Sequence, residues 1–163
     1  MQSTIRDVTE SDAEAICAIY NPFVATTAIS FEQQPVAAED MRARIRNITA
    51  EYPWLVTESS AGVVAYAYAT RWRSRAAYDH TAESTIYVSP AAQRSGVAYP
   101  LYMALLERLR ARGVHAAVGC ITVPNPGSIA FHEKCGFAKV AHFPQVGRKF
   151  DAWVDVGFWQ ITL

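Results

Sequence analysis

A loop of small residues joins a strand pattern to a helix pattern near the middle of the chain. Residues 83–89 read E-S-T-I-Y-V-S, and residues 93–98, Q-R-S-G-V-A, lead directly into an amphipathic helix. The first turn of a helix has free backbone N–H groups and the positive end of the helix dipole, so it favours phosphate groups. Gly96 and Ala98 leave room for a phosphate to approach the backbone. The spacing predicts a pyrophosphate site; the alternative is an ordinary turn in which Gly96 only relieves strain.

Glu83 lies at the start of the same strand pattern. By periodicity it could be a solvent-facing residue on a polar face with Thr81, Thr85 and Tyr87. The chemical alternative is a general base, because an amine is protonated at neutral pH and attacks a carbonyl carbon only after a nearby group accepts its proton. Burial would make the carboxylate more basic. Together with the phosphate loop, Glu83 favours a group-transfer enzyme that uses a nucleotide-containing cofactor.

The composition limits the class of protein. The chain has 163 residues, enough for one domain, and its fifteen basic and fifteen acidic residues cancel, which argues against a nucleic acid or an anionic membrane as partner. The sequence has no signal-peptide pattern and no apolar run of membrane-spanning length, so we expect a cytoplasmic protein. Cys17, Cys120 and Cys135 are widely spaced within apolar patterns, which predicts buried thiols and no metal site.

The periodicity of apolar residues predicts a single α+β domain over residues 1–163. Strands are expected at residues 4–8, 54–58, 63–70, 81–89, 114–121, 137–146 and 153–162. Helices are expected after a Ser11–Glu14 capping box, over residues 37–50, from Val97 to about Gly113, and from an Asn125 cap to Gly136. The aromatic residues of the last strand, Trp153, Phe158 and Trp159, are interpreted as sheet core.

Four segments of the sequence resemble one enzyme superfamily. The element order, with Q-x-x-G-x-A between the fourth strand and the third helix, resembles the acetyl-CoA-dependent N-acetyltransferases of the GNAT superfamily. The segments A-Y-D-H-T-A-E-S-T-I-Y-V-S (77–89), N-P-G-S-I-A-F-H-E-K-C-G-F (125–137) and D-V-G-F-W-Q (155–160) are similar to bacterial phosphinothricin and methionine sulfoximine N-acetyltransferases. The resemblance covers nearly the whole chain. It implies a mixed sheet of about seven strands flanked by about four helices, acetyl-CoA as co-substrate without a metal, and a homodimer.

The resemblance also assigns cofactor contacts. It implies that the backbone of residues 94–99 binds the CoA pyrophosphate and that the main chain of residues 86–88 pairs with the pantetheine arm. The implied cofactor-binding residues are Ile86, Tyr87, Val88, Arg94, Ser95, Gly96, Val97, Ala98, Tyr99, Asn125 and Ser128. The chain departs from the family at Ala98, where a second Gly is frequent, and Pro100 lacks an N–H that the first helical turn would leave free.

The resemblance places Glu83 at the general-base position and implies an acceptor pocket around it. The implied substrate-binding residues are Phe31, Arg73, Arg75, Glu83, Ser84 and Thr85, with Glu32 as a further wall. The planar guanidinium of arginine pairs bidentately with carboxylate or phosphinate oxygens. The alternative for Arg73 and Arg75 is a pair of solvated loop arginines, and for Phe31 it is the core.

His132 occupies the position at which many GNAT enzymes have a tyrosine that protonates the leaving thiolate. A histidine with a pKa near neutrality could act as that acid, or it could hold the pocket in shape. Both alternatives stay open at the level of the sequence. Asn125 is expected to cap its helix and also to contact the CoA arm.

These features imply an enzyme that transfers acetyl from acetyl-CoA to the α-amino group of a small amino-acid analogue, such as phosphinothricin or methionine sulfoximine, by direct attack in a ternary complex. One alternative is a different amine acceptor: a polyamine, an aminoglycoside or a protein N-terminus. Arg73 and Arg75 argue against the cationic acceptors among these. The other alternative is an acyl-CoA-binding sensor without catalysis, against which the retained Glu83 argues.

Overall fold

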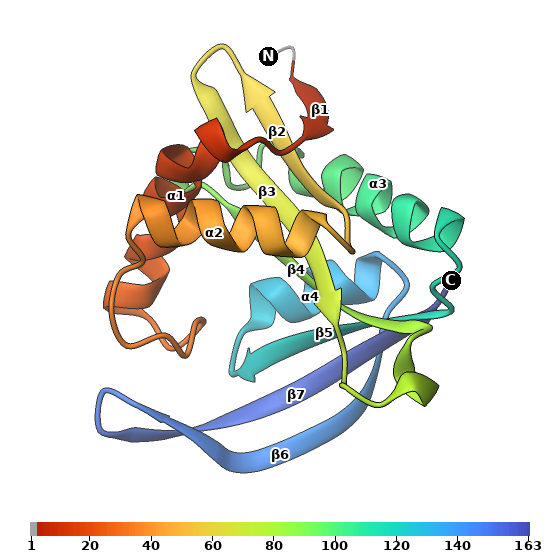
Figure 1. Cartoon of the computed structure of the whole chain (residues 1–163). Helices are drawn as coiled ribbons and strands as arrows, with labels where there is room; N and C mark the ends of the chain where they lie inside the picture. The colour runs from red at the N-terminus through yellow and green to blue at the C-terminus, as the bar shows by residue number, and fades with distance from the viewer. Residues whose placement is uncertain (1–2) are drawn as a thin grey trace.

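The computed structural model describes residues 3–163, which form a seven-stranded mixed sheet with four α-helices (Figure 1). The strands are β1 (Thr4–Asp7), β2 (Trp54–Ser59), β3 (Gly62–Arg71), β4 (Thr81–Val88), β5 (Ala116–Val123), β6 (Ala138–Lys149) and β7 (Ala152–Thr162). The helices are α1 (Ala13–Thr26), α2 (Ala38–Thr49), α3 (Ala98–Ala111) and α4 (Pro126–Lys134). The predicted α+β class and the predicted order of strands and helices are confirmed.

Helices cover both faces of the sheet, because successive strand residues point to opposite sides. On one face, Ile16 of α1 and Met41 of α2 pack in one apolar cluster with Tyr66 of β3. On the other face, the leucine stripe of α3 packs against the alanines of β3, including Ala67. The predicted inward residues Leu101, Leu105 and Leu109 are fully buried. Each buried leucine contributes about 1.5–3 kcal/mol to the free energy of unfolding.

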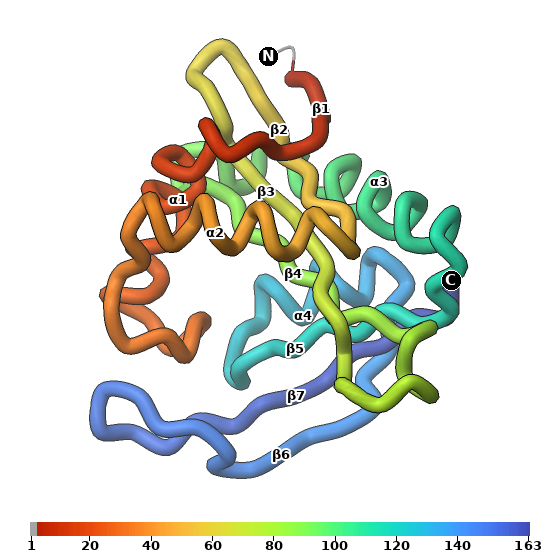
Figure 2. The backbone as a smooth tube through the Cα atoms, in the orientation of Figure 1, coloured from red at the N-terminus to blue at the C-terminus, as the bar shows by residue number. Residues whose placement is uncertain are grey.

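The centre of the sheet opens between β4 and β5. The strands follow the order β1-β2-β3-β4-β5-β7-β6, and β4 and β5 form the parallel pair of this otherwise antiparallel arrangement. Their pairing ends at Glu83 opposite Val118, although both strands continue for five more residues. Figure 2 shows the two strands diverging beyond this point. The sheet therefore has a gap that begins at Glu83.

The start of α1 differs from the prediction. The capping box is formed by Thr9 and Asp12 at the preceding 3₁₀ turn, not by Ser11 and Glu14. The sequence contains both patterns in overlapping frames. Asp12 is selected because its carboxylate accepts hydrogen bonds from the Thr9 N–H at 2.8 Å and from both terminal nitrogens of Arg6 in β1.

The fifth strand begins two residues later than predicted, and the end of α3 explains why. Gly113 adopts a left-handed conformation, with φ at 79°. Its N–H donates to the carbonyl of Arg110, and the N–H of Val114 donates to that of Leu109. This is the Schellman pattern of helix termination. Val114 is thus part of the helix cap, and β5 begins at Ala116.

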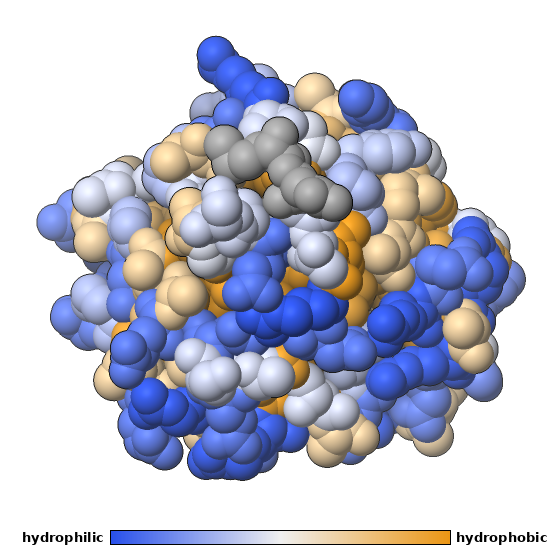
Figure 3. All heavy atoms as spheres, turned by 90° about the horizontal axis from the view of Figure 1, so that it is seen from above, coloured by the Kyte–Doolittle hydropathy of each residue, from blue (hydrophilic) through white to orange (hydrophobic). Residues whose placement is uncertain are grey.

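The hairpin of β6 and β7 extends beyond the body of the sheet (Figure 1). Several of its large apolar side chains are exposed to solvent. The prediction that the last strand is entirely core is wrong for Trp153, which is 62% exposed, although Trp159 is buried. The other exposed apolar residues of the hairpin are Val140, Phe143, Val146 and Phe150. The face of the molecule seen from above is instead mostly hydrophilic (Figure 3). None of the helices formed by residues 3–163 has the length and apolar character needed to cross a membrane.

Candidate active site

A cavity of about 600 Å³ lies where β4 and β5 diverge. Every residue of β4 from Glu83 to Val88 lines it, with Cys120 to Thr122 of β5 on the other side. The loop between α1 and α2 and the start of α4 complete the wall. Of the predicted site residues, the cavity brings together Phe31, Glu83, Ser84, Thr85, Ile86, Tyr87, Val88, Ala98, Asn125, Ser128 and His132.

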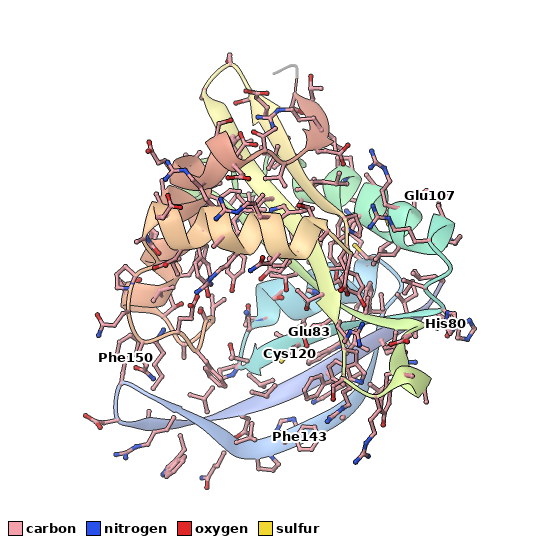
Figure 4. All side chains as sticks on the ribbon, viewed as in Figure 1. His80, Glu83, Glu107, Cys120, Phe143 and Phe150 are labelled. Atoms are coloured by element: carbon pink, nitrogen blue, oxygen red, sulfur yellow. The ribbon has the colours of Figure 1, made fainter. Side chains whose placement is uncertain are left out.

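Glu83 is a half-buried carboxylate at the point where the gap begins. Among residues 3–163, no side chain forms an ion pair or a hydrogen bond with this carboxylate. Burial alone raises its pKa above the usual value for glutamate. Figure 4 shows Glu83 beside Cys120, in the opening between the α1–α2 layer and the β6–β7 hairpin. The carboxylate is therefore a stronger base than a solvated glutamate, and the cavity can admit an amine to it.

Cys120 corrects one prediction, because it is exposed in the cavity, whereas Cys17 and Cys135 are buried as predicted. Partial burial in the cavity wall, together with the nearby charge of Glu83, raises the pKa of the Cys120 thiol to about 11. The thiol is thus neutral at physiological pH and is a weakly polar part of the wall.

The second half of β4 presents an open strand edge to the cavity. The N–H of Ser89 donates to the carbonyl of Val64 in β3 at 2.9 Å. Hydrogen bonds along an antiparallel strand alternate in direction, so the backbone groups of Tyr87 also face β3, whereas those of Ile86 and Val88 face away from it. Because the pairing with β5 has already ended, these groups are available to an extended ligand such as an amide-containing arm.

The loop of residues 93–98 has the backbone geometry of an anion site. Arg94 and Gly96 both have positive φ angles, 63° and 88°. Among the described residues, the N–H groups of Arg94, Gly96 and Val97 have no hydrogen-bond acceptor, and α3 begins at Ala98. Successive free N–H groups at a helix N-terminus suit a phosphate. The predicted contact Ser95 differs, because its N–H and its hydroxyl both donate to the carbonyl of Ala92.

The start of α4 has the predicted cap. The side chain of Asn125 accepts a hydrogen bond from the N–H of Ser128 at 3.2 Å, and Pro126 occupies the first turn. Asn125 and Ser128 both line the cavity, whereas the predicted cofactor contact Tyr99 lies outside the lining and is 42% exposed.

His132 is buried against Gly119, where an added Cβ would lie 2.8 Å from the ring. Its Nδ1 lies 2.8 Å from the carbonyl oxygen of Ser128, which can only accept, so Nδ1 has the proton of the neutral ring. Burial lowers the pKa of His132. The neutral ring, packed among Tyr102, Phe131 and Phe137, is better suited to a structural role than to protonating a thiolate.

Three of the residues predicted for the acceptor pocket lie outside the cavity lining, and a fourth, Ser84, lines it but has its hydroxyl engaged elsewhere. Arg73 and Arg75 are exposed and are not part of the cavity lining, and the guanidinium of Arg73 lies 5.1 Å from the ring centroid of Trp72. Ser84 is buried, with its hydroxyl 2.8 Å from that of Tyr102 on the α3 side. Glu32 forms an ion pair with Arg44 outside the cavity lining.

Several cavity residues were not predicted. Tyr68 lines the cavity beside Glu83 and lies opposite Thr85 in the β3–β4 ladder. Alternation along β3 predicts that Tyr66 and Tyr68 share one face, but the register of β3 with β4 follows only from the tertiary structure. The other unpredicted lining residues are Phe23, Ile29, Ser30, Gln93, Cys120, Ile121, Thr122, Gly127, Phe131 and Val156. Within residues 3–163, no group of three His, Cys, Asp or Glu side chains is arranged to bind a metal ion.

Comparison with known proteins identifies the family. Residues 5–157 match the model of the acetyltransferase (GNAT) domain. The chain is 38% identical to a phosphinothricin N-acetyltransferase of Streptomyces viridochromogenes, over 96% of this chain and 85% of that protein. It is 36% identical to an L-methionine sulfoximine/L-methionine sulfone acetyltransferase of Pseudomonas aeruginosa, over 100% of this chain and 96% of that protein. The fold is also similar to the structure of a GNAT phosphinothricin acetyltransferase from Sinorhizobium meliloti in complex with acetyl-CoA. The TM-score is 0.94 and the identity 33%, over 100% of this chain and 89% of that chain. The chain therefore belongs to the GNAT family of acetyl-CoA-dependent acetyltransferases.

Proposed function

We propose that this enzyme transfers acetyl from acetyl-CoA to the α-amino group of a small amino-acid analogue of the phosphinothricin or methionine sulfoximine type, with Glu83 as general base. The observation that carries the proposal is the half-buried, unpaired carboxylate at the point where β4 leaves β5. The names of the relatives support the acceptor class. The balanced charge of the chain supports a small molecule rather than a nucleic acid or a membrane as partner, and we infer a cytoplasmic location, where acetyl-CoA is available.

In the proposed reaction, acetyl-CoA lies in the gap as an added strand. The free backbone groups of Ile86 and Val88 bind its pantetheine arm. The free N–H groups of Arg94, Gly96 and Val97, with those of the first turn of α3, bind its pyrophosphate. A free N–H group of β4 polarises the thioester carbonyl, and we assign this role to the N–H of Val88. Asn125 and Ser128 contact the arm from the start of α4.

Glu83 accepts a proton from the ammonium group of the acceptor, directly or through a water. The free amine then attacks the thioester carbon in the ternary complex, a C–N bond forms, the C–S bond breaks, and CoA leaves as the thiolate. The nitrogen loses its second proton and the thiolate gains one, so the net products are the amide, CoA and one proton. We assign His132 to holding β5 and α4 in place, because its ring is neutral and buried.

Arg73 and Arg75 are proposed to bind the acidic groups of the acceptor from the rim of the cavity. The ring of Trp72 packs on Phe158 at 5.4 Å, and Phe158 is the β7 partner of Cys120 in the cavity wall. The arginine segment is thus connected to the wall through two side chains. Arg75 lies at the other end of that segment, as the N-terminal cap of the 3₁₀ turn that begins at Ala76.

The release of CoA thiol by purified enzyme tests the acceptor class. The panel is phosphinothricin, methionine sulfoximine, methionine sulfone, the common amino acids and spermidine, each with acetyl-CoA. We expect turnover with the tetrahedral analogues and none with spermidine. Turnover with spermidine alone would replace the proposed acceptor by a polyamine. Binding of acetyl-CoA without turnover on any amine would favour the sensor alternative.

We also propose that the enzyme is a homodimer that buries the β6–β7 hairpin. Strand β6 is an edge strand, and edge strands with exposed apolar residues associate readily with other chains. Phe150 and Trp153, about 60% exposed, lie near the turn of this hairpin. An apolar surface of this kind suits a second copy of the same chain, which presents the same surface.

Trp153→Lys is expected to convert the dimer to a monomer, because a charge in an apolar interface is costly to desolvate. Light scattering after size-exclusion chromatography should give twice the 18.0 kDa chain mass for the wild type and a single chain mass for the variant. Tyr78→Lys, which adds the same charge at another exposed aromatic residue, serves as the control and should remain dimeric. A monomeric wild type would disprove the proposed dimer.

A further inference from the structure

Lys149, at the end of β6, is a buried lysine that the proposed chemistry does not use. Its side chain is 2% exposed, whereas lysines are almost never fully buried without a partner. The Nζ atom donates hydrogen bonds to two backbone carbonyls, 2.7 Å to Val24 and 2.6 Å to Ser30. Neither partner belongs to the hairpin. The ammonium therefore connects the β6–β7 hairpin to the segment around the end of α1.

The two carbonyls are well placed to hold a cation. Val24 lies in the last turn of α1, where carbonyl groups lack helical partners and the helix dipole is negative. Ser30 lies in the loop between α1 and α2, and its hydroxyl lies 2.6 Å from that of Tyr20. In the same loop, Asn21 of α1 holds both the N–H and the carbonyl of Val36. Residues of α1 thus hold the loop at Ser30 and at Val36, and Lys149 adds a contact from the β6–β7 hairpin.

The residue that follows Ser30 is Phe31, which forms a wall of the cavity that also contains Glu83. The hairpin touches this ring as well. A Cβ added at Gly147, two residues before Lys149, would lie 2.2 Å from the Phe31 ring, so only glycine fits there without moving the ring. The hairpin thus positions Phe31 in two ways, through the backbone of Ser30 and through direct contact.

We propose that Lys149 is a positioning residue for the acceptor amine: by holding Ser30, it fixes the Phe31 wall of the cavity at the distance from Glu83 that the acceptor requires. Lys149 itself does not touch the substrate. A methionine would fill the same volume without the cost of burying a charge, but it would leave two carbonyls without donors. This inference rests on the proposed function, because it assigns Phe31 to the acceptor side of the site.

Steady-state kinetics of Lys149→Met test the inference with the acceptor that the wild type uses best. The KM for the acceptor should rise about 10-fold or more, whereas the KM for acetyl-CoA and the kcat at saturating acceptor should change by less than about 3-fold, the pattern of lost acceptor binding. Lys139→Met, on the same strand, is the control and should match the wild type, because Lys139 is exposed on the Trp159 side of the sheet. Lys149→Met should add little to the effect of Phe31→Ala, since both act through one wall. An unchanged acceptor KM in folded Lys149→Met would overturn the proposal.

Two further measurements keep the test decisive. If Lys149→Met does not fold, Lys149→Gln replaces it; Gln keeps N–H donors but is one bond shorter, so the acceptor KM should still rise, and an unchanged KM would again overturn the proposal. Hydrogen exchange of residues 27–36 does not depend on knowing the acceptor. Exchange there should be faster in the variant than in the wild type, with no change in residues 98–111. Equal exchange in residues 27–36 would show that Lys149 does not hold the loop at Ser30. Wild-type inactivity on the whole panel would instead refute the proposed acceptor class and leave the exchange result to decide on Lys149.

Discussion

Glu83→Gln is expected to lower kcat by about 100-fold or more at neutral pH while leaving the affinity for acetyl-CoA unchanged. The amide has nearly the shape of the carboxylate but cannot accept a proton, and the acceptor arrives as an ammonium ion. The cofactor contacts proposed for Ile86, Val88 and residues 94–99 do not involve this side chain. Single-turnover acetylation and equilibrium binding of acetyl-CoA measure the two effects separately. An unchanged rate would remove Glu83 from the mechanism.

The same variant should change the pH profile of the reaction. Burial raises the pKa of Glu83, and the base must be ionised to act. The wild-type kcat/KM for the acceptor should therefore fall as the pH decreases through this raised pKa, which lies above the ordinary glutamate range. In Glu83→Gln the residual activity should show no break at that pKa and should instead rise steadily with pH, because only solvent then deprotonates the acceptor amine. A wild-type limb at the pKa of a solvated glutamate would mean that the ionising group is not a buried one.

Although Glu83→Gln should lower the activity, it should preserve or raise the stability of the fold. A carboxyl whose pKa is raised by folding binds its proton more tightly in the native state than in the unfolded state, so the free energy of unfolding falls as the pH rises through these two pKa values. At pH 7 the ionised, unpaired Glu83 is thus a destabilising group. Glu83→Gln should melt at or above the wild-type temperature in buffer at pH 7. A lower melting temperature would show that the lost rate partly reflects a damaged fold.

Residue patterns within single elements were enough to predict much of the fold. The α3 stripe of Leu101, Leu105 and Leu109 follows the helical period, and Asn125-Pro126 is a strong start signal for α4; both were confirmed. The start of α1 was not predictable in this way. Two capping patterns overlap there, and the choice of Asp12 depends on Arg6, whose position in the sheet follows only from the tertiary structure.

The candidate site was predictable where it follows one strand and not where it depends on two. Residues 83–88 line the cavity as one continuous segment of β4. The gap itself arises because β5 leaves β4 after Val118, and nothing in either strand's pattern marks that point. Cys120 is exposed for this reason: its pattern is that of a buried strand, but its neighbour on the β4 side has separated. The contact between Lys149 and Ser30 spans 119 residues, beyond the reach of any local pattern.

Gly96→Val is expected to weaken the binding of acetyl-CoA by about 5- to 150-fold, which corresponds to about 1–3 kcal/mol of backbone strain. Gly96 has a φ of 88°, a conformation that a β-branched residue adopts only at a cost. An added Cβ meets no atom of the protein within 4 Å, so the expected cost of the substitution comes from the backbone conformation and not from a clash of that atom. The loop can escape the strain only by giving up the arrangement in which its N–H groups are free for a pyrophosphate. Isothermal titration with acetyl-CoA measures the loss.

Gly62→Val is the matched control for this prediction. Gly62 has nearly the same φ, 92°, equally open surroundings, and lies in the β2–β3 turn outside the cavity lining. Both variants should lose similar amounts of stability, but only Gly96→Val should lose affinity for acetyl-CoA. Dephospho-CoA keeps the pyrophosphate and lacks the 3′-phosphate, so it should show the same relative loss with Gly96→Val. Equal affinities of the two glycine variants for acetyl-CoA would mean that the loop at residues 93–98 is only a turn, and the pyrophosphate would then have to be bound elsewhere along the gap.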